Sequence, residues 1–568
     1  MSLSWAGYFN MASLIEALDF FLSSYNEQQK QAITSAAPHI LCVAGAGSGK
    51  TTVLTKRIEF LVRFRSVEQG KILAITFTRK AREEMERRLH SLGIGVEVET
   101  FNSFCERSLR MHSAIAYGRE MRVLSYKDKL DLFHQALKKE GKTMEQAINL
   151  YYSAAKKTTD ELAHGFMNDC FAVIEYYKSE GKELGRFDRD EQLSIHEKAS
   201  VKMVHAVCSE IMRLMDEQGF RDYTDQLLHA LRFFEQHHEK IPSYEHVLVD
   251  EYQDVNSAQI RLLELLHWKN LFCVGDPRQS IFGWRGSKIH YILDFRSKYP
   301  GCEVIPLVKN YRSAQCIVAL INATVAHMGL PALESSMADG KASLLYLSSE
   351  IEEYTYVVEQ ILKSTLKRES IFVLARTNRQ LEELSTSMKL RGVKHIVRNE
   401  DTMAALKEDH VLLATVHAIK GMEAECVFVV GCNSQNFPCK AGDHPIVDLV
   451  KAGYNKREEE RRLFYVALSR AKKELHLTTA NGITKFITPD MMKLLHVVAR
   501  EKDAFDRLRE WRMEKADELG VPPYMIFHDS VLLDIAARKP ESLDELEQVR
   551  GIGPSKIVKY GEEVLKVL

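Results

Sequence analysis

Long hydrophobic runs and signs of export are missing from this chain of 568 residues. No stretch of about 18 apolar residues is present, so we expect no membrane-spanning segment. The N-terminal sequence also lacks the basic start, the long apolar core and the small-residue cleavage site of a signal peptide. The sequence does not decide between Met1 and Met11 as the start. These absences predict a cytoplasmic protein without a membrane partner.

Excess charge is also missing, because 77 basic and 78 acidic residues leave a formal net charge of −1. That balance excludes a uniformly basic protein that coats nucleic acid, but it is compatible with a basic channel inside the fold. Charged residues make up 27% and hydrophobic residues 45% of the chain, as in ordinary globular proteins. A fibrous or disordered chain is therefore excluded, and the length suggests about four domains.

Cysteine is sparse, with ten residues and no CxxC pair. Cys432 and Cys439 alone do not have the spacing of a structural zinc site. We therefore expect reduced cysteines that serve as small core residues, which is typical of a reducing compartment.

Short apolar runs alternate with long helical stretches along the chain. The runs lack a period of two and end at glycine or polar turns, which indicates strands buried on both faces of parallel sheets. They cover residues 39–45, 72–77, 246–251, 270–276, 370–376, 410–416 and 426–431. The pattern predicts an α/β protein with two parallel sheets and additional helical parts.

We expect five structural units. They are a first α/β domain (14–105 and 244–304), a helical insertion in it (106–243), a second α/β domain (305–490), a helical linker (491–520) and a small helical C-terminal domain (521–568). The last boundary rests on Pro522 and Pro523, because proline begins a helix more readily than it continues one.

A phosphate-binding motif is the first sign of chemistry. HILCVAGAGSGKTTVLTK (39–56) reads as strand, glycine-rich loop and helix, and it matches G-x-x-x-x-G-K-[ST] except that Ala44 holds the first glycine position. Lys50 is expected to reach the β- and γ-phosphates, and Thr51 to hold Mg²⁺. The residues expected to line the nucleotide are Ala44, Gly45, Ala46, Gly47, Ser48, Gly49, Lys50, Thr51 and Thr52.

Two adjacent carboxylates, Asp250 and Glu251, end another apolar run. Asp250 suits Mg²⁺ coordination, and Glu251 suits a general base for an attacking water. Adjacent acids are more often a solvated surface pair, but the buried strand before them argues for a site at the edge of the sheet.

These motifs resemble those of the UvrD/Rep/PcrA helicases of superfamily 1. The resemblance extends through VGDPRQSIFGWRG (274–286), NYRS (310–313) and EEERRLFYVALSRA (458–471), in family order over about residues 25–485. It implies two RecA-like motor domains with ATP and Mg²⁺ in the cleft between them. It further implies 3′ to 5′ movement on single-stranded DNA, unwinding of 3′-tailed duplexes in repair, replication or recombination, and association with the nucleoid.

The resemblance also assigns roles to residues around the nucleotide. Gln29 would bond the adenine edge, Tyr311 would stack on adenine, and Glu423 would bind the ribose. The residues implied at the γ-phosphate are Gln279, Arg312 and Arg470. Thr52 stands where the family usually has an arginine on the other face of adenine, so we hypothesise a looser selectivity for the base.

Contacts with DNA follow from the same resemblance. The residues implied are Thr76, Phe77, Thr100, Phe101, Asn102, Trp284, Arg285 and His417. Asn102 replaces the usual histidine of its segment. Stacking by Trp284 is the functional interpretation of a tryptophan in a glycine-flanked loop, and a plug of the core is the alternative.

Two features differ from the common family plan. Only about 100 residues separate Arg312 from Thr415, which leaves 400–410 where a large mobile subdomain would be inserted, so we infer that this subdomain is absent. The tail (524–568) resembles an HRDC domain, a helical accessory module. Arg550, Lys556 and Lys559 are candidate phosphate contacts there, and a protein-docking role is the alternative.

Two other functions compete with a helicase. One is a DNA-stimulated ATPase that removes proteins from DNA and unwinds poorly. The other is a non-catalytic DNA-binding subunit, against which the complete set of nucleotide-site residues argues.

Overall fold

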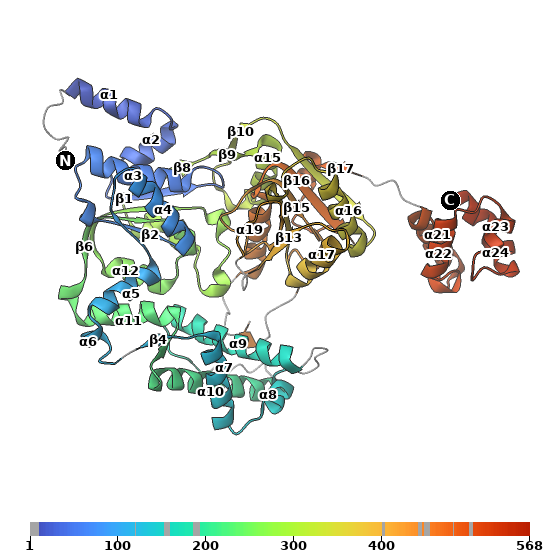
Figure 1. The fold of residues 1–568 in the computed structure, drawn as a ribbon, viewed down its shortest axis with the longest axis horizontal. Helices are drawn as coiled ribbons and strands as arrows, with labels where there is room; N and C mark the ends of the chain where they lie inside the picture. The colour runs from blue at the N-terminus through green and yellow to red at the C-terminus, as the bar shows by residue number, and fades with distance from the viewer. Residues whose placement is uncertain are drawn as a thin grey trace.

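The computed structural model describes residues 11–119, 121–152, 159–185, 194–399, 404–440, 446–447, 455–480, 482–498 and 504–568. These residues form two α/β domains, a helical insertion and a separate C-terminal group of helices (Figure 1). The expected α/β class with two parallel sheets, a helical insertion and an all-α end is confirmed. None of the described helices is long and apolar enough to cross a bilayer.

The first domain contains a six-stranded parallel sheet in the order β3-β2-β6-β7-β1-β8. Its strands are β1 (His39–Ala44), β2 (Ile72–Thr76), β3 (Glu97–Thr100), β6 (Ser243–Val249), β7 (His267–Gly275) and β8 (Glu303–Leu307). Its helices are α1 (Met11–Leu22), α2 (Glu27–Thr34), α3 (Lys50–Phe64), α4 (Arg79–Ser91), α5 (Phe101–Met111), α12 (Ser257–Leu265), α13 (His290–Leu293) and α14 (Phe295–Lys298). All five residues of β2 are buried, as expected for a strand covered on both faces.

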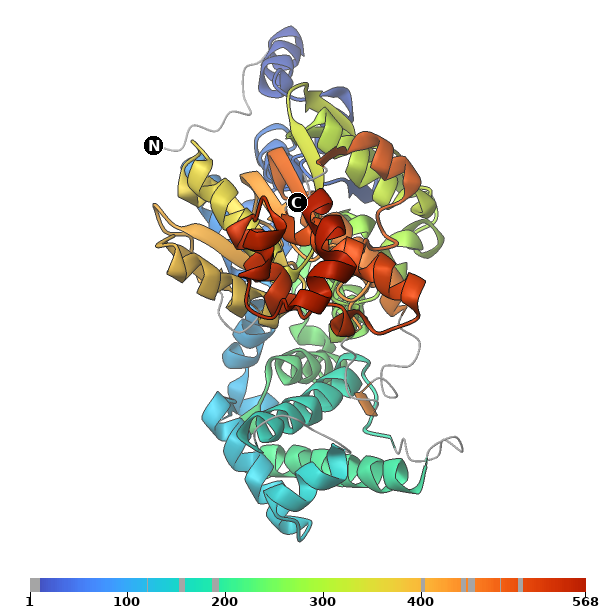
Figure 2. The same cartoon turned by 90° about the vertical axis from the view of Figure 1, so that its right-hand side faces the viewer.

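The insertion leaves this domain after α5 and lies to one side of both sheets in Figures 1 and 2. Its elements are α6 (Ser113–Ala116), β4 (Arg122–Val123), α7 (Tyr126–Lys139), α8 (Met144–Tyr151), α9 (Thr159–Ser179), α10 (Ile195–Glu217), β5 (Phe220–Arg221) and α11 (Tyr223–Gln236). α11 packs on α5 and α12 and so anchors the insertion to the first sheet.

The second domain contains a seven-stranded parallel sheet in the order β13-β14-β12-β15-β16-β11-β17. Its strands are β11 (Lys341–Leu347), β12 (Ile371–Ala375), β13 (His395–Arg398), β14 (Val411–Thr415), β15 (Ala424–Val429), β16 (Ala471–Ala480) and β17 (His496–Val498). Its helices are α15 (Gln315–Thr324), α16 (Glu350–Lys363), α17 (Asn378–Leu390), α19 (Lys456–Leu468) and α20 (Pro489–Leu494). A two-stranded ribbon of β9 (Lys309–Ala314) and β10 (Glu334–Met337) lies between the sheets.

The C-terminal group consists of α21 (Ala504–Leu519), α22 (Asp529–Arg538), α23 (Leu543–Glu547) and α24 (Pro554–Val567). The structure moves the expected boundaries, because Leu508 and Ala516 of α21 are buried in the same core as α22 and α24. Most of the expected linker 491–520 therefore belongs to the C-terminal domain. In the second domain, β17 pairs with β11, and α20 packs on α15. Arg550 and Lys559 are exposed, whereas Lys556 lies 4.8 Å from the ring centroid of Phe527.

Candidate nucleotide site and DNA-facing residues

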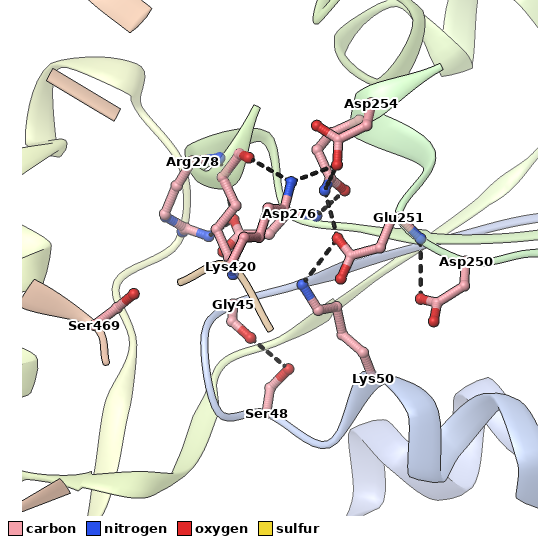
Figure 3. Close-up of polar contacts among 12 residues, drawn as sticks. Gly45, Ser48, Lys50, Asp250, Glu251, Asp254, Asp276, Arg278, Lys420 and Ser469 are labelled. Atoms are coloured by element: carbon pink, nitrogen blue, oxygen red, sulfur yellow. Dashed lines mark hydrogen bonds and ion pairs between the residues drawn. The ribbon is translucent and has the colours of Figure 1, made fainter. Parts of the chain in front are cut away.

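The glycine-rich loop between β1 and α3 has the shape of an anion-binding loop. Gly47 and Gly49 have φ angles of 68° and 83°, a conformation that glycine adopts without a steric cost. The Ser48 hydroxyl donates a 2.9 Å hydrogen bond to the carbonyl of Gly45 (Figure 3). Because α3 begins at Lys50, the N–H groups and the positive dipole end of the helix face the loop.

Lys50 extends from this loop toward two carboxylates that follow β6 (Figure 3). Its Nζ lies 3.5 Å from Oε2 of Glu251 and is buried without a hydrogen bond. Glu251 has a φ of 50°, which is strained for a residue with a Cβ. Asp250 is 5% exposed and accepts a 2.9 Å hydrogen bond from the Glu251 N–H. A buried ammonium without a hydrogen bond and two fixed carboxylates fit a phosphate group and a divalent cation.

The two carboxyl groups have pKa values that are displaced in opposite directions. Burial, followed by the charge of Glu251, raises the pKa of Asp250 to about 7. Burial also acts to raise the pKa of Glu251, but the charges of Lys50 and Lys420 outweigh it and lower that pKa to about 2. Glu251 is therefore ionised at neutral pH, as a general base must be. A cation beside Asp250 would favour its ionised form as well.

Two arginines of the second domain reach the same cleft. Arg470 follows α19, is 1% exposed, and its Nη2 donates a 3.2 Å hydrogen bond to Oε1 of Gln279 in the first domain. Gln279 in turn donates a 2.8 Å hydrogen bond to Asp276. Arg312 of β9 lies against the glycine-rich loop, since a Cβ added at Gly47 would lie 2.6 Å from the Cβ of Arg312. The structure thus brings together the side chains implied at the γ-phosphate.

Lys420 also belongs to this cleft, although the sequence analysis did not single it out. Its Nζ forms an ion pair with Asp254 and donates a 2.9 Å hydrogen bond to the carbonyl of Gln279 (Figure 3). Gln253 extends the network, because its amide donates to Asp254 at 3.0 Å and accepts from the N–H of Asp276 at 2.8 Å. The sequence does offer a signal, because Lys420 lies in TVHAIKGME (415–423), the motif in which the resemblance assigns roles to His417 and Glu423.

The side of the site expected to hold adenine is open at Tyr311. Its ring is 43% exposed, and its hydroxyl accepts a 2.8 Å hydrogen bond from Nδ2 of Asn26. Gln29 is 5% exposed, and its amide bonds to the backbone of Asn26 and of the glycine-rich loop. In this structure the Gln29 amide therefore supports the glycine-rich loop, and it is not free to bond adenine. Thr52 is exposed.

Glu423, which the resemblance places at the ribose, is engaged within the protein. Its carboxylate lies 2.5 Å from Nε of Arg312 and 3.1 Å from Nζ of Lys472. Burial opposes ionisation, but the charge of Arg312 outweighs it and lowers the pKa of Glu423. Glu423 therefore holds Arg312 in place. Its side chain is 39% exposed, so it can contact a ribose only if it also keeps or gives up its ion pair with Arg312.

Four residues implied in DNA binding gather around Phe282 at the boundary of the two domains. The rings of Phe77 and Phe282 stack with their centroids 6.0 Å apart, and Trp284 meets His417 edge to face at 6.1 Å. The guanidinium of Arg285 lies 4.4 Å from the Trp284 ring centroid and covers one of its faces. Burial lowers the pKa of His417 to about 3, so its ring is neutral. Aromatic rings beside a cation suit the stacking of unpaired bases. We refer to these five residues as the aromatic cluster.

The other residues implied at DNA do not join this cluster. Thr76 and Phe101 are 0% and 3% exposed, so their side chains are not presented to a ligand. Thr100 caps α5, where its hydroxyl accepts a 3.0 Å hydrogen bond from the N–H of Ser103. Nδ2 of Asn102 donates a 3.2 Å hydrogen bond to a carbonyl of the insertion. The expected contacts of the Thr76 and Phe101 side chains with DNA are therefore corrected, because both side chains are buried inside the protein.

Family models match nearly the whole chain. The UvrD/REP helicase N-terminal domain matches residues 25–300, the UvrD-like helicase C-terminal domain matches 305–403 and 395–482, and the HRDC domain matches 501–568. The last match begins before the expected boundary at residue 521 and agrees with the core of α21.

Individual relatives agree with these models. "ATP-dependent DNA helicase PcrA" of Staphylococcus epidermidis is 30% identical over 423 residues, which are 71% of this chain and 54% of that protein. The protein of the same name from Bacillus subtilis is 28% identical over 512 residues, 86% of this chain and 62% of that protein. The chain therefore spans about half to three fifths of the length of these relatives. A solved C-terminal domain of a possible DNA helicase from Lactobacillus plantarum is 20% identical over 33% of this chain, with a TM-score of 0.26.

The resemblance expected from the motifs is confirmed by the family models for both α/β domains and for the C-terminal helices. With its glycine-rich loop and its paired carboxylates at one cleft, the chain belongs to the UvrD-like helicase family.

Proposed function

We propose that this protein is an ATP-dependent DNA helicase that moves from 3′ to 5′ along single-stranded DNA and unwinds 3′-tailed duplexes. The observation that carries the proposal is the composition of the cleft, where Arg470 bonds to Gln279 and Lys420 pairs with Asp254 across the two domains. A site completed by two domains can open and close with each nucleotide, which is how a motor step arises. The names of the PcrA relatives support ATP-dependent DNA unwinding.

Phosphoryl transfer asks the protein mainly for positioning and for positive charge. In this proposal, Lys50 and the N–H groups of the loop bind the phosphates. Asp250 and the hydroxyl of Thr51 would hold Mg²⁺, which would supply further positive charge. Glu251 accepts a proton from the attacking water, and Arg470 stabilises the charge that spreads over the γ-phosphate oxygens.

The same contacts connect the nucleotide site to the aromatic cluster. Lys420, which pairs with Asp254 in the cleft, also lies 4.9 Å from the ring centroid of Phe282. Glu459 of α19 accepts a 2.9 Å hydrogen bond from the N–H of Gly283, which adjoins Phe282. A movement of the second domain is therefore passed directly to the residues proposed to hold DNA.

The decisive test is unwinding of 3′-tailed and 5′-tailed duplexes by the full chain and by Lys50→Ala. We expect the parent protein to unwind the 3′-tailed substrate, because the proposed motor loads on that strand. Lys50→Ala should lose ATP hydrolysis and unwinding, since Lys50 supplies the ammonium that faces the phosphates. Its affinity for single-stranded DNA should persist, because the aromatic cluster is unchanged.

Lys71→Ala provides a control that removes an exposed lysine just before β2, at the end of the strand away from the phosphate loop. Equal unwinding of both tailed duplexes would contradict the proposed polarity. Unaltered hydrolysis by Lys50→Ala would contradict the nucleotide site itself.

Selectivity for the base is expected to be loose. Thr52 is exposed and has no ring or guanidinium to stack on adenine, so Tyr311 is the ring that we propose to hold the base. We expect a kcat/KM for GTP that is comparable to that for ATP in the presence of single-stranded DNA, and a stronger preference for ATP in Thr52→Arg. Steady-state hydrolysis of both nucleotides measures this, and strict ATP dependence of the parent protein would contradict it.

A second candidate function is removal of proteins from DNA with poor unwinding. β13 ends at Arg398 and β14 begins at Val411, and the described residues 404–410 between them contain no helix or strand, so this connection is too short to hold a separate duplex-engaging subdomain. A strand-displacement assay run beside displacement of a DNA-bound protein distinguishes the two activities.

A further inference from the structure

Three side chains with metal-binding atoms converge on the second sheet, away from the nucleotide cleft. Cys426 of β15 is in register with Glu474 of β16, and Phe428 is in register with His476. Because side chains alternate between the two faces of a strand, Cys426, Glu474 and His476 share one face. The Sγ, carboxylate and imidazole atoms of these residues all lie within 4.8 Å of one another.

We propose that Cys426, Glu474 and His476 bind one zinc ion. Thiolate, imidazole and carboxylate are the ligands that zinc takes in proteins, and three protein ligands with a fourth open position form a known class of site. Cys426 is 3% exposed and the His476 side chain 14%, whereas the Glu474 side chain is 43% exposed. The site is therefore closed on its inner side and open to solvent at the carboxylate, where an ion enters and a water completes its shell.

The imidazole is already oriented for this role. Its Nδ1 lies 2.8 Å from the hydroxyl of Ser343 on the neighbouring β11, and the ring stacks on Phe428 with their centroids 4.8 Å apart. The Ser343 hydroxyl can accept the Nδ1–H bond, which leaves the lone pair of Nε2 facing Glu474 at 3.4 Å. A hydrogen bond at the second nitrogen is the usual support of a histidine that binds a metal.

Two features oppose binding, the charge of Lys341 and the proton on the Cys426 thiol. Lys341 is in register with Glu474 on β11, but it is the exposed first residue of its strand. Burial raises the pKa of the Cys426 thiol, so an entering ion must displace a proton from sulfur.

The proposed zinc site lies beside a bulge in the second sheet. The register of β15 and β16 shifts between Ala424 and Cys426, where β16 carries one extra residue. Glu423 and Arg470 of the nucleotide cleft lie just before this bulge, and the three ligands lie just after it. A bound ion would join β15 to β16 beside the bulge and so restrain the segments that lead to the cleft.

Cobalt provides a probe that reports the sulfur ligand directly. We would titrate the full chain, free of nucleotide, with Co²⁺ alone and record a thiolate-to-cobalt band in the near ultraviolet together with d–d bands in the visible. The expected result is one equivalent of Co²⁺ that Zn²⁺ displaces. Cys426→Ser should abolish the thiolate band, and Glu474→Gln should weaken Zn²⁺ binding by at least about 10-fold.

Cys432→Ser is the matched control, because Cys432 is a fully buried cysteine that follows β15 and lies outside the cluster. Glu474→Gln alters a half-exposed side chain and is expected to fold even if Cys426→Ser does not. A thiolate band that is absent from the parent protein, or that persists in Cys426→Ser, would overturn the proposal. Co²⁺ bound at Asp250 gives no thiolate band, so failure here is distinct from failure of the proposed function.

Discussion

Replacing Arg470 with alanine is expected to lower the kcat of DNA-stimulated ATP hydrolysis by about 10³–10⁵-fold, while single-stranded DNA still binds. The buried guanidinium is held by hydrogen bonds to Gln279, to the Ser469 hydroxyl and to the carbonyls of Met422 and Val466. Burial lowers the pKa of Arg470 to about 9, which leaves it charged at neutral pH. A charge that is fixed and shielded from water acts strongly on developing negative charge. Steady-state kinetics and DNA-binding anisotropy measure the two effects.

Arg457→Ala is the matched control, because Arg457 is exposed on α19, the helix that precedes Arg470. It should change kcat little. Arg470→Lys keeps a positive charge but cannot make all the bonds of the guanidinium, so we expect only partial recovery. Thermal unfolding of each variant shows whether the fold persists. An unchanged kcat in a folded Arg470→Ala protein would contradict the proposal that the second domain completes the site.

The fold could be predicted well where the hydrophobic pattern is regular. The run at 72–77 has no polar alternation, and β2 is indeed buried along its whole length. The boundary at Pro522 was misplaced because proline marks a change of direction and not the edge of a core. α21 precedes that proline, yet Leu508 packs against the helices that follow it. Which hydrophobic faces pack against each other is decided by the tertiary structure, and the local sequence around a proline does not reveal it.

The candidate site could be predicted where a motif combines several residues with one chemical task. Lys50 and Glu251 lie far apart in the sequence, but both follow strands of one parallel sheet, and the structure places them 3.5 Å apart. Lys420 was missed because a single lysine in a loop has many possible partners, and its pairing with Asp254 depends on how the two domains meet. Phe101 was assigned to DNA, although an aromatic side chain at the start of a helix serves the core equally well.

Replacing Glu251 with glutamine is expected to lower the kcat for ATP by about 10²–10⁴-fold and to leave ATP binding nearly intact. The change keeps the size of the side chain and removes the carboxylate that would accept a proton from water. The positive φ of Glu251 is strain that the fold maintains at this position, and it directs the side chain toward Lys50. The loss should therefore fall on kcat and not on affinity, because Lys50 and the loop still contact the phosphates.

Glu245→Gln is the control, since Glu245 lies on the same strand, β6, and takes no part in the cleft. Affinity for a fluorescent ATP analogue and single-turnover hydrolysis separate binding from chemistry. If Glu251 only positions Lys50, Glu251→Gln should weaken binding and hydrolysis together, because the glutamine amide no longer attracts the ammonium. If Glu251 is the general base, nucleotide stays bound and unhydrolysed, and the two domains should then remain closed on it. Trapping of labelled ATP with Glu251→Gln, but not with Lys50→Ala, therefore distinguishes proton transfer from simple charge pairing at this cleft.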